Sequence, residues 1–337
     1  MTAAVLAVDG GNSKTDVALI GMDGTLLGLS RGPGSCHQNI GVDATMQLLS
    51  VLVAIAAAEA GLDPNGPVAR HGAFYLAGAD LPVEIAMLEK RLTDIGWAPD
   101  VVVDNDTFAL LRAGTESPDR VAVVCGAGIN CVGVSAAGGV ARFPSLGRLS
   151  GDWGGGGQLG REALWLAVRA EDGRGRSTAL SRAVPDHFGL ATVAEVSAAF
   201  HLGDLPAARL HELTPVLLRC AGAGDDVSAA VVERMAEEVV LLATVALGRL
   251  HLLDQPAELV LGGGVLAARD PLLLGSVAAK VRDRAPQVDI RVVDRPPVVG
   301  AALLGMDALG ASRAAEARLR EALLERTGAS RPDGLVE

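Results

Sequence analysis

One structural unit occurs twice along this chain, and it restricts the possible folds more than any other feature. A short apolar strand leads into a glycine turn, a second strand, a polar turn and a third strand, first over 3–30 and again over 121–143. Three short strands joined by tight turns predict a meander. The copies lie about 115 residues apart, a longer period than a solenoid repeat has. They share little sequence beyond the glycine turn, so the repeat is one of organisation.

Strands and helices alternate after each copy, which indicates an α/β protein. After the first copy the pattern predicts a loop over 31–41, a helix over 42–60, a strand over 72–76, a helix over 83–95, a strand over 101–103 and a helix from about Asp106. After the second it predicts helices over most of 160–253, a strand over 258–261, a helix after Gly264, a strand over 288–293, an apolar helix from Pro297, a charged helix over 311–326 and a frayed tail over 327–337.

We expect two lobes, because 337 residues that are 50 % hydrophobic exceed one small domain and allow each lobe its own core. The predicted N-terminal lobe spans 1–113. The predicted C-terminal lobe spans 114–296 and contains a helical insertion at about 160–253. We expect a closing helix at about 297–325 to pack back on the first lobe.

Charge and aromatic content argue against a nucleic-acid partner. The formal net charge is -11, whereas nucleic-acid phosphates need a basic surface. Aromatic residues make up only 3 % of the chain, and they form no cluster with basic residues on which bases could stack. An acidic chain can still bind ATP, because a few backbone amides and one metal ion bind phosphates locally.

The cysteines and apolar segments predict a cytoplasmic protein without a membrane partner. Cys36, Cys125, Cys131 and Cys220 form no C-x-x-C pair, so reduced thiols are expected rather than zinc ligands or disulfides. The N-terminus has no basic segment and reaches Asp9 too early for a signal peptide. The apolar stretch 239–253 is shorter than the roughly 20 residues of a spanning helix, and we interpret it as a core helix.

The first glycine turn is a candidate phosphate loop. An apolar strand ends at Asp9, and the loop that follows consists of Gly10, Gly11, Asn12, Ser13, Lys14 and Thr15. Glycine lets the backbone approach an anion closely, and successive amides form a concave anion site. Asp9 repels phosphate, so its expected role is to hold Mg²⁺ through water. A plain hairpin turn explains this segment equally well when it is taken alone.

Two further glycine segments strengthen the phosphate interpretation. Gly126, Ala127 and Gly128 occupy the matching turn of the second copy, so the two turns could hold phosphates from both sides. Gly262, Gly263 and Gly264 follow a strand and open a helix, where a base or ribose could lie against the backbone; a tight strand-to-helix turn is the alternative. Gly155-x-Gly157-x-x-Gly160 formally matches a dinucleotide fingerprint, but no clear parallel strand precedes it, so we attribute the match to chance.

Two aspartates are candidates for chemistry on a substrate. Asp106 follows Asp104 and Asn105 at a strand-to-helix junction, where a carboxylate could accept the proton of a substrate hydroxyl. Asp152 follows Gly151 in a glycine-rich loop, where it could bind sugar hydroxyls. For both, the alternative is an aspartate that caps a helix.

Together these motifs resemble the BadF/BadG/BcrA/BcrD-type ATPase family, and within it the N-acetylglucosamine kinases, from about Ala3 to Gly305. This family belongs to the actin, hexokinase and heat-shock chaperone superfamily. The resemblance implies two duplicated actin-like (ribonuclease H-like) ATPase domains, each with a mixed β-sheet, and a nucleotide cleft between them. It also implies ATP and Mg²⁺ as cofactors. The motifs that match are the turn after Asp9, the segment 125–131, the pair Asn105-Asp106, the adenosine motif 261–264 and the closing helix 298–305.

By this resemblance Asp106 is the catalytic base, and the sugar is bound by Cys36, His37, Asn39, Asp106, Asn130, Gly151 and Asp152. The chain departs from the family pattern on the sugar side. Cys36 stands where relatives have Asn, Ser145-Leu146-Gly147 replaces Gly-Trp-Gly, and Trp153 stands where relatives have Glu.

We therefore predict an ATP-dependent kinase, a cytoplasmic homodimer that phosphorylates the 6-hydroxyl of N-acetylglucosamine. Glucosamine, N-acetylmuramic acid or a hexose are alternative acceptors. A second hypothesis is an ATPase that activates a partner dehydratase, but Cys125 and Cys131 show no obvious arrangement for the iron–sulfur cluster of such relatives. A third is a sugar-sensing regulator, but Asp9 leaves no room for the DNA-binding helix-turn-helix that precedes the first phosphate motif in such regulators.

Overall fold

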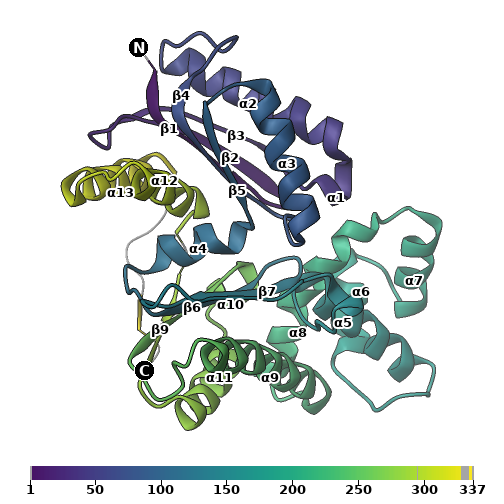
Figure 1. Cartoon of the computed structure of the whole chain (residues 1–337). Helices are drawn as coiled ribbons and strands as arrows, with labels where there is room; N and C mark the ends of the chain where they lie inside the picture. Colours follow the sequence, from purple (N-terminus) through teal and green to yellow (C-terminus); the bar gives the residue numbers. More distant parts are fainter. Residues whose placement is uncertain (1, 294, 328–333, 336–337) are drawn as a thin grey trace. The chain divides into compact units, whose positions relative to one another are not determined.

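A computed structural model describes residues 2–293, 295–327 and 334–335 of the chain. The described residues form two compact units (Figure 1). The first consists of the described parts of 1–122 and 293–334, and the second of 123–292 with Leu335. The lobes predicted from the sequence, 1–113 with 297–325 and 114–296, differ from these units at their boundaries. Each unit is described below by itself.

The sheet of the first unit has five strands in the order β3-β2-β1-β4-β5. β1 (Ala3–Gly10), β2 (Lys14–Ile20) and β3 (Leu26–Pro33) form an antiparallel meander. β4 (Ala69–Leu76) and β5 (Asp100–Asp104) continue the sheet parallel to β1. The predicted meander is confirmed, and the carboxyl ends of the three parallel strands meet at one edge of the sheet.

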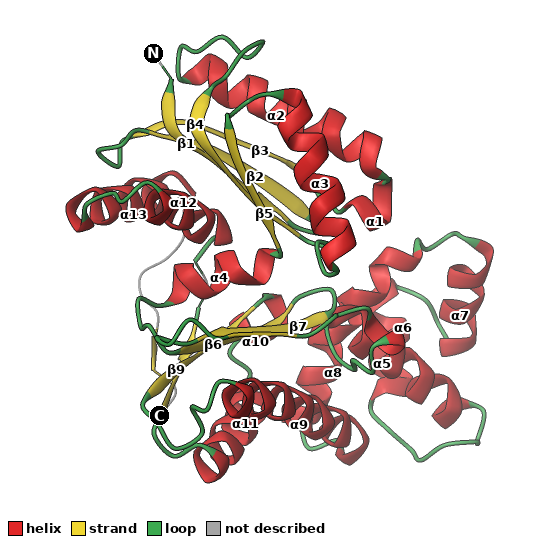
Figure 2. Ribbon diagram, viewed as in Figure 1, coloured by secondary structure: helices red, strands yellow, loops and turns green. Residues whose placement is uncertain are grey.

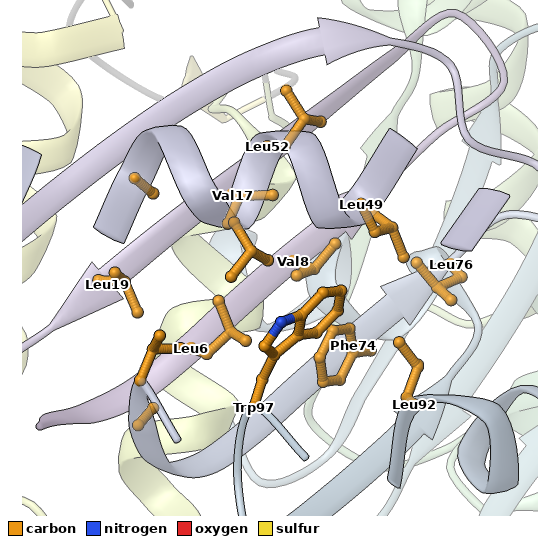
Figure 3. Close-up of a cluster of buried hydrophobic side chains, with 14 of the residues drawn as sticks. Leu6, Val8, Val17, Leu19, Leu49, Leu52, Phe74, Leu76, Leu92 and Trp97 are labelled. Carbon is orange, nitrogen blue, oxygen red and sulfur yellow. The ribbon is translucent and has the colours of Figure 1, made fainter. Parts of the chain in front are cut away.

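One face of this sheet packs on α2 (Val42–Glu59) and α3 (Pro82–Ile95). Side chains alternate between faces along a strand, so Leu6 and Val8 of β1 point to this side (Figure 3). They join a cluster of buried side chains that includes Leu49 and Leu52 of α2, Phe74, Leu76, Leu92 and Trp97. Among the described helices, α2 has the length and composition to cross a membrane. Leu49, Leu52 and Val53 of this helix are buried against the sheet, whereas Val51 and Ile55 are exposed.

The other face packs on α4 (Asp106–Gly114), α12 (Pro297–Ala308) and α13 (Arg313–Thr327) (Figure 2). A Cβ at Gly300 of α12 would lie 1.7 Å from the carbonyl oxygen of Ala109, so the two helices can approach this closely only with glycine at that position. Arg112 of α4 donates to Asp307 at 2.8 and 3.1 Å and to Glu316 at 2.7 Å. These contacts fix α4, whose first residue is Asp106.

The sheet of the second unit has the strand order β11-β10-β9-β6-β7-β8. It is mixed, because β7 and β8 are antiparallel whereas β9 and β10 are parallel. The strands are β6 (Arg120–Cys125), β7 (Ile129–Val134), β8 (Val140–Arg142), β9 (Ala257–Gly262), β10 (Val288–Val292) and β11 (Gly334–Leu335). The second meander is therefore also present, and its first glycine turn joins β6 to β7.

Helices make up most of the remainder of the second unit (Figure 1). They are α5 (Gly156–Glu171), α6 (Leu180–Phe188), α7 (Val193–Leu202), α8 (Leu213–Gly222), α9 (Asp226–Arg249), α10 (Gly264–Ala267) and α11 (Pro271–Arg284), with short 3-10 turns η1 (Gly147–Leu149) and η2 (Ala207–Glu212). The apolar stretch 239–253 lies largely in α9, as predicted.

Three local predictions were wrong. The loop expected over 31–41 contains the end of β3 and the short helix α1 (His37–Ile40). The helix expected after Gly264 is two helices, because Arg269 adopts a positive φ of 54° and Asp270 caps a new helix that begins at Pro271. In the expected frayed tail, 334–335 form β11, while 328–333 and 336–337 lie outside the described residues.

Candidate active site

The first unit brings carboxylates to the carboxyl ends of its parallel strands. Asp9 pairs in register with Tyr75 of β4, and Tyr75 pairs with Asp104 of β5. Asp106 follows two residues later as the first residue of α4. In open α/β sheets this edge is where ligands bind.

Asp9 is buried among other carboxylates. Only 4 % of its surface is exposed, and burial raises its pKa well above the ordinary value, with further contributions from the charges of Asp106 and Asp16. Lys14 and Arg31 act in the opposite direction. Arg31 is largely committed to Asp16, to which it donates at 2.6 and 3.0 Å. The described protein groups therefore stabilise the ionised form of Asp9 only in part.

Asp106 does not cap its helix, which removes the alternative explanation for this residue. The cap is Asn105, whose side chain accepts a hydrogen bond of 2.9 Å from the Thr107 amide and donates to Asp80 at 2.7 Å. Asp106 stays partly exposed, and burial raises the pKa of its carboxyl to about 6, while hydrogen bonds from the Thr107 amide and its own amide lower it. A carboxylate with a pKa of about 6 is ionised at neutral pH and is a better proton acceptor than an ordinary aspartate.

The first glycine turn is a hairpin that backbone hydrogen bonds hold in place. The Gly11 amide donates to Lys14 at 2.9 Å, the Ser35 amide donates to Gly11 at 3.1 Å, and the Ala77 amide donates to Gly10 at 2.7 Å. A Cβ at Gly10 would lie 2.6 Å from both Leu76 Cδ2 and Ser35 Oγ. Thr15 is fully buried, whereas Asn12, Ser13 and Lys14 are exposed at the turn.

The predicted sugar segment lies next to this turn. Asn39 donates to the Asn12 side chain at 2.8 Å. Cys36 is buried at the start of α1, and burial raises the pKa of its thiol. His37 Nε2 lies 3.6 Å from Glu84 Oε1, and Glu84 also accepts from Gln38 at 2.9 Å. The structure thus brings Asn39 to the first glycine turn and holds His37 beside an acidic group.

The second glycine turn rests on the start of α5. The turn closes by a 2.9 Å hydrogen bond from the Gly126 amide to Gly128. The amides of Gly156 and Gly157 donate to the carbonyl oxygens of Gly126 and Ala127 at 2.7 and 3.0 Å. The glycines of the supposed fingerprint therefore serve packing: a Cβ at Gly155, whose φ is +85°, would lie 2.5 Å from the Gly128 backbone.

A cavity of about 730 Å³ opens beside the second turn, entirely within the second unit. Its lining includes Ala127, Gly128 and Asp152, so the structure brings two predicted site segments together. Asp152 accepts a 2.6 Å hydrogen bond from Ser150 and does not cap α5, whose cap is Gly155. The capping explanation for Asp152 is therefore excluded as well.

The remaining predicted residues of this unit lie at the carboxyl end of β9, at the start of β7 and in the loop before Asp152. Gly263 adopts φ +81°, and a Cβ there would lie 2.5 Å from Cys125, so this glycine is required by packing on β6. A Cβ at Gly264 would meet nothing within 4 Å. Asn130 accepts a 2.6 Å hydrogen bond from the Cys131 amide. Gly151 has φ +84° in the loop that precedes Asp152.

The sequence analysis assigned no site role to other residues of the cavity, although it placed Ser145 and Gly147 in a segment that departs from the family pattern on the sugar side. These residues are Ile129, Ser145, Gly147, Arg148, Gly154, Gln158, Arg161, Glu162 and Trp165. Four of these, from Gln158 to Trp165, come from the first three turns of α5, directly after the glycine-rich loop. Their position in the sequence could have indicated them. Residues in the first turns of a helix that begins in a glycine run lie close to the segment that the glycines contact, here the second glycine turn.

Comparison with known proteins identifies the family of this chain. The sequence profile of the BadF/BadG/BcrA/BcrD ATPase family matches residues 6–305. The chain belongs to this family. The resemblance deduced from the motifs is therefore confirmed, and membership in an ATPase family implies that the protein uses ATP.

Two curated relatives of this BadF-type ATPase are sugar kinases. The N-acetylmuramic acid/N-acetylglucosamine kinase of Clostridium acetobutylicum is 25 % identical over 266 residues, which cover 78 % of this chain and 85 % of the relative. The N-acetyl-D-glucosamine kinase of Dictyostelium discoideum is 24 % identical over 311 residues, which cover 90 % and 97 %.

The fold of this BadF-type ATPase is that of a solved bacterial structure. A protein of Chromobacterium violaceum, provisionally assigned as an N-acetylglucosamine kinase, superimposes with a TM-score of 0.70 and 22 % identity, covering 90 % of this chain and 99 % of that one. The predicted α/β fold class, two actin-like domains with a mixed sheet each, is confirmed. The nucleotide cleft expected between the domains stays a prediction.

The cysteines of this BadF-type ATPase do not form a cluster site in the part of the chain that the structure describes. All four are free and buried. Burial raises the pKa of each thiol, that of Cys125 to about 12, which opposes the thiolate form that metal ligation needs. No group of three or more His, Cys, Asp or Glu side chains is arranged for a metal ion among the described residues.

Proposed function

We propose that this protein is an ATP-dependent amino-sugar kinase that phosphorylates the 6-hydroxyl of N-acetylglucosamine. The observation that carries the proposal is Asp106, an uncapped, partly exposed carboxylate whose pKa is raised to about 6 at the carboxyl edge of the first sheet. The two curated kinases of amino sugars support the choice of acceptor. Glucosamine, N-acetylmuramic acid and hexoses are the alternative acceptors.

In the proposed reaction Asp106 accepts the proton of the sugar 6-hydroxyl as the oxygen attacks the γ-phosphorus of ATP. Its raised pKa matches a proton acceptor that works near neutral pH. Backbone amides at the turns 10–15 and 126–128 would bind the phosphates, and 262–264 would lie against the adenosine. Catalysis would then rest mostly on positioning and on stabilising the charge of the phosphoryl group.

Asp9 is suited to a Mg²⁺ ion that also binds the ATP phosphates. Its buried carboxyl lies in the field of Asp106 and Asp16, and a divalent cation would stabilise the ionised form that burial and these charges oppose. Mg²⁺ usually keeps several waters and takes only one or two protein carboxylates, so a site with Asp9 alone fits its chemistry. The ion would supply charge neutralisation at the phosphates, while Asp9 holds it in place.

Each unit has hydrogen-bonding groups that we assign to the sugar. In the first unit, Asn39 donates to Asn12 of the first glycine turn, and we assign its neighbours His37 and the buried Cys36 to the same task. In the second, Asp152 lines the cavity, with Gly151 beside it in the chain, and we assign Asn130 to the same task. A homodimeric state and a cytoplasmic location remain predictions.

A panel of sugars with a coupled ADP readout tests this proposal. We expect N-acetylglucosamine to stimulate ADP release well above basal hydrolysis, and phosphate to appear on the 6-position of the product by NMR. If no hexose or amino sugar raised ADP release above the basal rate, the kinase assignment would be abandoned. A preference for another sugar would keep the enzyme class and replace the acceptor.

A further inference from the structure

The cavity of the second unit contains two arginines that the proposed reaction has not used. Arg148 lies in η1 and Arg161 lies in α5, and both line the cavity. Within the described residues neither side chain has an ion-pair or hydrogen-bond partner. By contrast, Arg31 and Arg112 each bind carboxylates at two nitrogens. Both residues are exposed, so their guanidinium groups are solvated and available to an anionic ligand, since the group stays charged and has five N–H donors.

Arg161 is the arginine that lies next to the second glycine turn. Side chains on a helix point back toward its N-terminus, so Arg161 reaches toward Gly157, one turn earlier. A Cβ placed on Gly157 would lie 3.6 Å from an Arg161 guanidinium nitrogen and 3.2 Å from the carbonyl oxygen of Ala127. The Arg161 guanidinium and Ala127 of the second glycine turn thus both lie next to Gly157.

Neither carboxylate of the cavity forms an ion pair with Arg161 in the described part of the chain. The cavity has two carboxylates to match its two arginines, and Asp152 accepts from Ser150 at 2.6 Å while Glu162 accepts from Gln158 at 2.8 Å. Ala127 and Gly128 are exposed, and within the described part of the chain their amides donate to no protein acceptor. Two free amides and a guanidinium fork form a donor set that suits the oxygens of a phosphoryl group.

We propose that Arg161 binds the phosphoryl group that is transferred from ATP to the sugar. This inference rests on the proposed kinase function. During transfer a bond forms between the sugar 6-oxygen and the γ-phosphorus, and the bond from that phosphorus to the ADP oxygen breaks. The hydroxyl proton passes to Asp106. Arg161 neither gains nor loses a proton; it donates hydrogen bonds to the phosphoryl oxygens before and after transfer.

The position of Arg148 favours this assignment for Arg161 over a role in recognising an acidic sugar. Arg148 lies in η1, beside Asp152, whose amide donates to Gly147 at 2.9 Å. An acidic substituent on a sugar bound by Asp152 would therefore lie nearer the segment that contains Arg148, whereas the Arg161 guanidinium lies near Ala127 of the second glycine turn.

Nucleotide binding by wild type and an Arg161→Gln variant tests the proposal in the presence of Mg²⁺. Calorimetry would compare ADP with the non-hydrolysable β,γ-imido analogue of ATP. We expect Arg161→Gln to bind ADP as wild type does, but to bind the analogue about 10- to 100-fold more weakly, the loss typical of a hydrogen bond to a charged group. We expect kcat to fall at least as far, and Arg161→Lys to recover part of both losses.

Arg182→Gln on α6 is the matched control. Its side chain is 92 % exposed and lies 3.5 Å from Asp186, so it removes one arginine charge without touching the cavity. We expect wild-type binding and turnover from it. Thermal unfolding of both variants would show that the fold is intact.

Three results would overturn the proposal, and they differ from one another. If wild type bound neither nucleotide, the kinase function itself would fail, and this inference with it. If wild type bound both and Arg161→Gln matched it in analogue binding and kcat, only the role of Arg161 would fail. If Arg161→Gln slowed turnover of N-acetylmuramic acid but not of N-acetylglucosamine, Arg161 would recognise a sugar carboxylate instead.

Discussion

The two glycine turns have the same place in the two copies of the repeated unit, yet their surroundings differ. The turn after β1 follows a buried aspartate, and Gly10 is enclosed by Leu76 and Ser35. The turn after β6 follows a buried cysteine, Cys125, and a Cβ at Gly126 or Gly128 would meet nothing within 4 Å. Similar backbone structures have therefore acquired different chemistry.

The difference extends to the charges near each turn. Acidic groups dominate near the first turn. Burial raises the pKa of both Asp9 and Asp106, and the charges of Asp106 and Asp16 raise that of Asp9 further. The second turn has exposed amides and the unpaired Arg161. On the proposed function, the first turn would supply the metal carboxylate next to the base, and the second would supply donors for phosphate oxygens.

Replacing Asp106 by Asn should have the largest effect and tests whether the first unit supplies the base. We expect kcat to fall roughly 10²–10⁴-fold, the usual contribution of a general base, with ATP binding retained. Stability at neutral pH should not fall, because the variant removes a carboxylate whose ionisation burial opposes. Asp94→Asn on α3 serves as a control, because its exposed carboxylate only pairs with Lys90. Wild-type turnover in Asp106→Asn would remove the base from this position.

Replacing Gly155 by Ala tests how firmly the second turn is supported. The residue has φ +85°, and its new Cβ would lie 2.5 Å from backbone atoms of Gly128. We expect a loss of about 2–4 kcal/mol in the free energy of unfolding, from the left-handed conformation and the overpacking together. Urea denaturation measures it. Gly173→Ala is a matched control for φ alone, because it has φ +81° and open space around it. Equal losses in both variants would show that the contact with Gly128 contributes nothing.

The pH dependence of turnover should report the electrostatics of the first unit. Burial raises the pKa of Asp106 from 3.8 to about 6, and only the ionised form accepts a proton. We therefore expect kcat/KM for the sugar to be level above about pH 7 and to fall as the pH drops through 6, approaching tenfold per pH unit. Measurement at saturating ATP and Mg²⁺ keeps nucleotide binding constant. A profile level down to pH 4.5 would contradict the raised pKa.

The sequence was sufficient for most strands of both meanders because their signal is local. Val5, Leu6, Ala7 and Val8 are fully buried on two faces of a sheet, and such strands appear as continuous apolar runs between turns. The break between α10 and α11 was also readable, since Asp270-Pro271 is a typical helix start, but the apolar pattern on both sides hid it.

The sites could be predicted less completely, because they depend on contacts between distant segments. The sequence placed Asp106 at a helix start, but only the structure shows that Asn105 caps the helix, so that the Asp106 carboxylate is not used as the cap. A role for Arg161 could not be predicted from the sequence, because it depends on the contact between α5 and a turn more than thirty residues earlier. The glycines near 155–160 match a motif by chance and are explained by the same contact.

Alanine at Gly128 should have the smallest effect on stability and separates the two turns most directly. The position has open space around it and needs no positive φ, so we expect the free energy of unfolding to change by no more than about 0.5 kcal/mol. Gly10→Ala is the matched variant in the first turn; its Cβ would lie 2.6 Å from two buried side chains, and overpacking there should cost about 1–3 kcal/mol.

Because Gly128 lines the cavity, its new methyl group should weaken binding of the imido analogue of ATP although the fold is unchanged. Urea denaturation and calorimetry of the two variants measure both quantities. Equal destabilisation would mean that the turns are alike in packing, and unchanged analogue binding by Gly128→Ala would mean that phosphate does not approach the second turn at this residue.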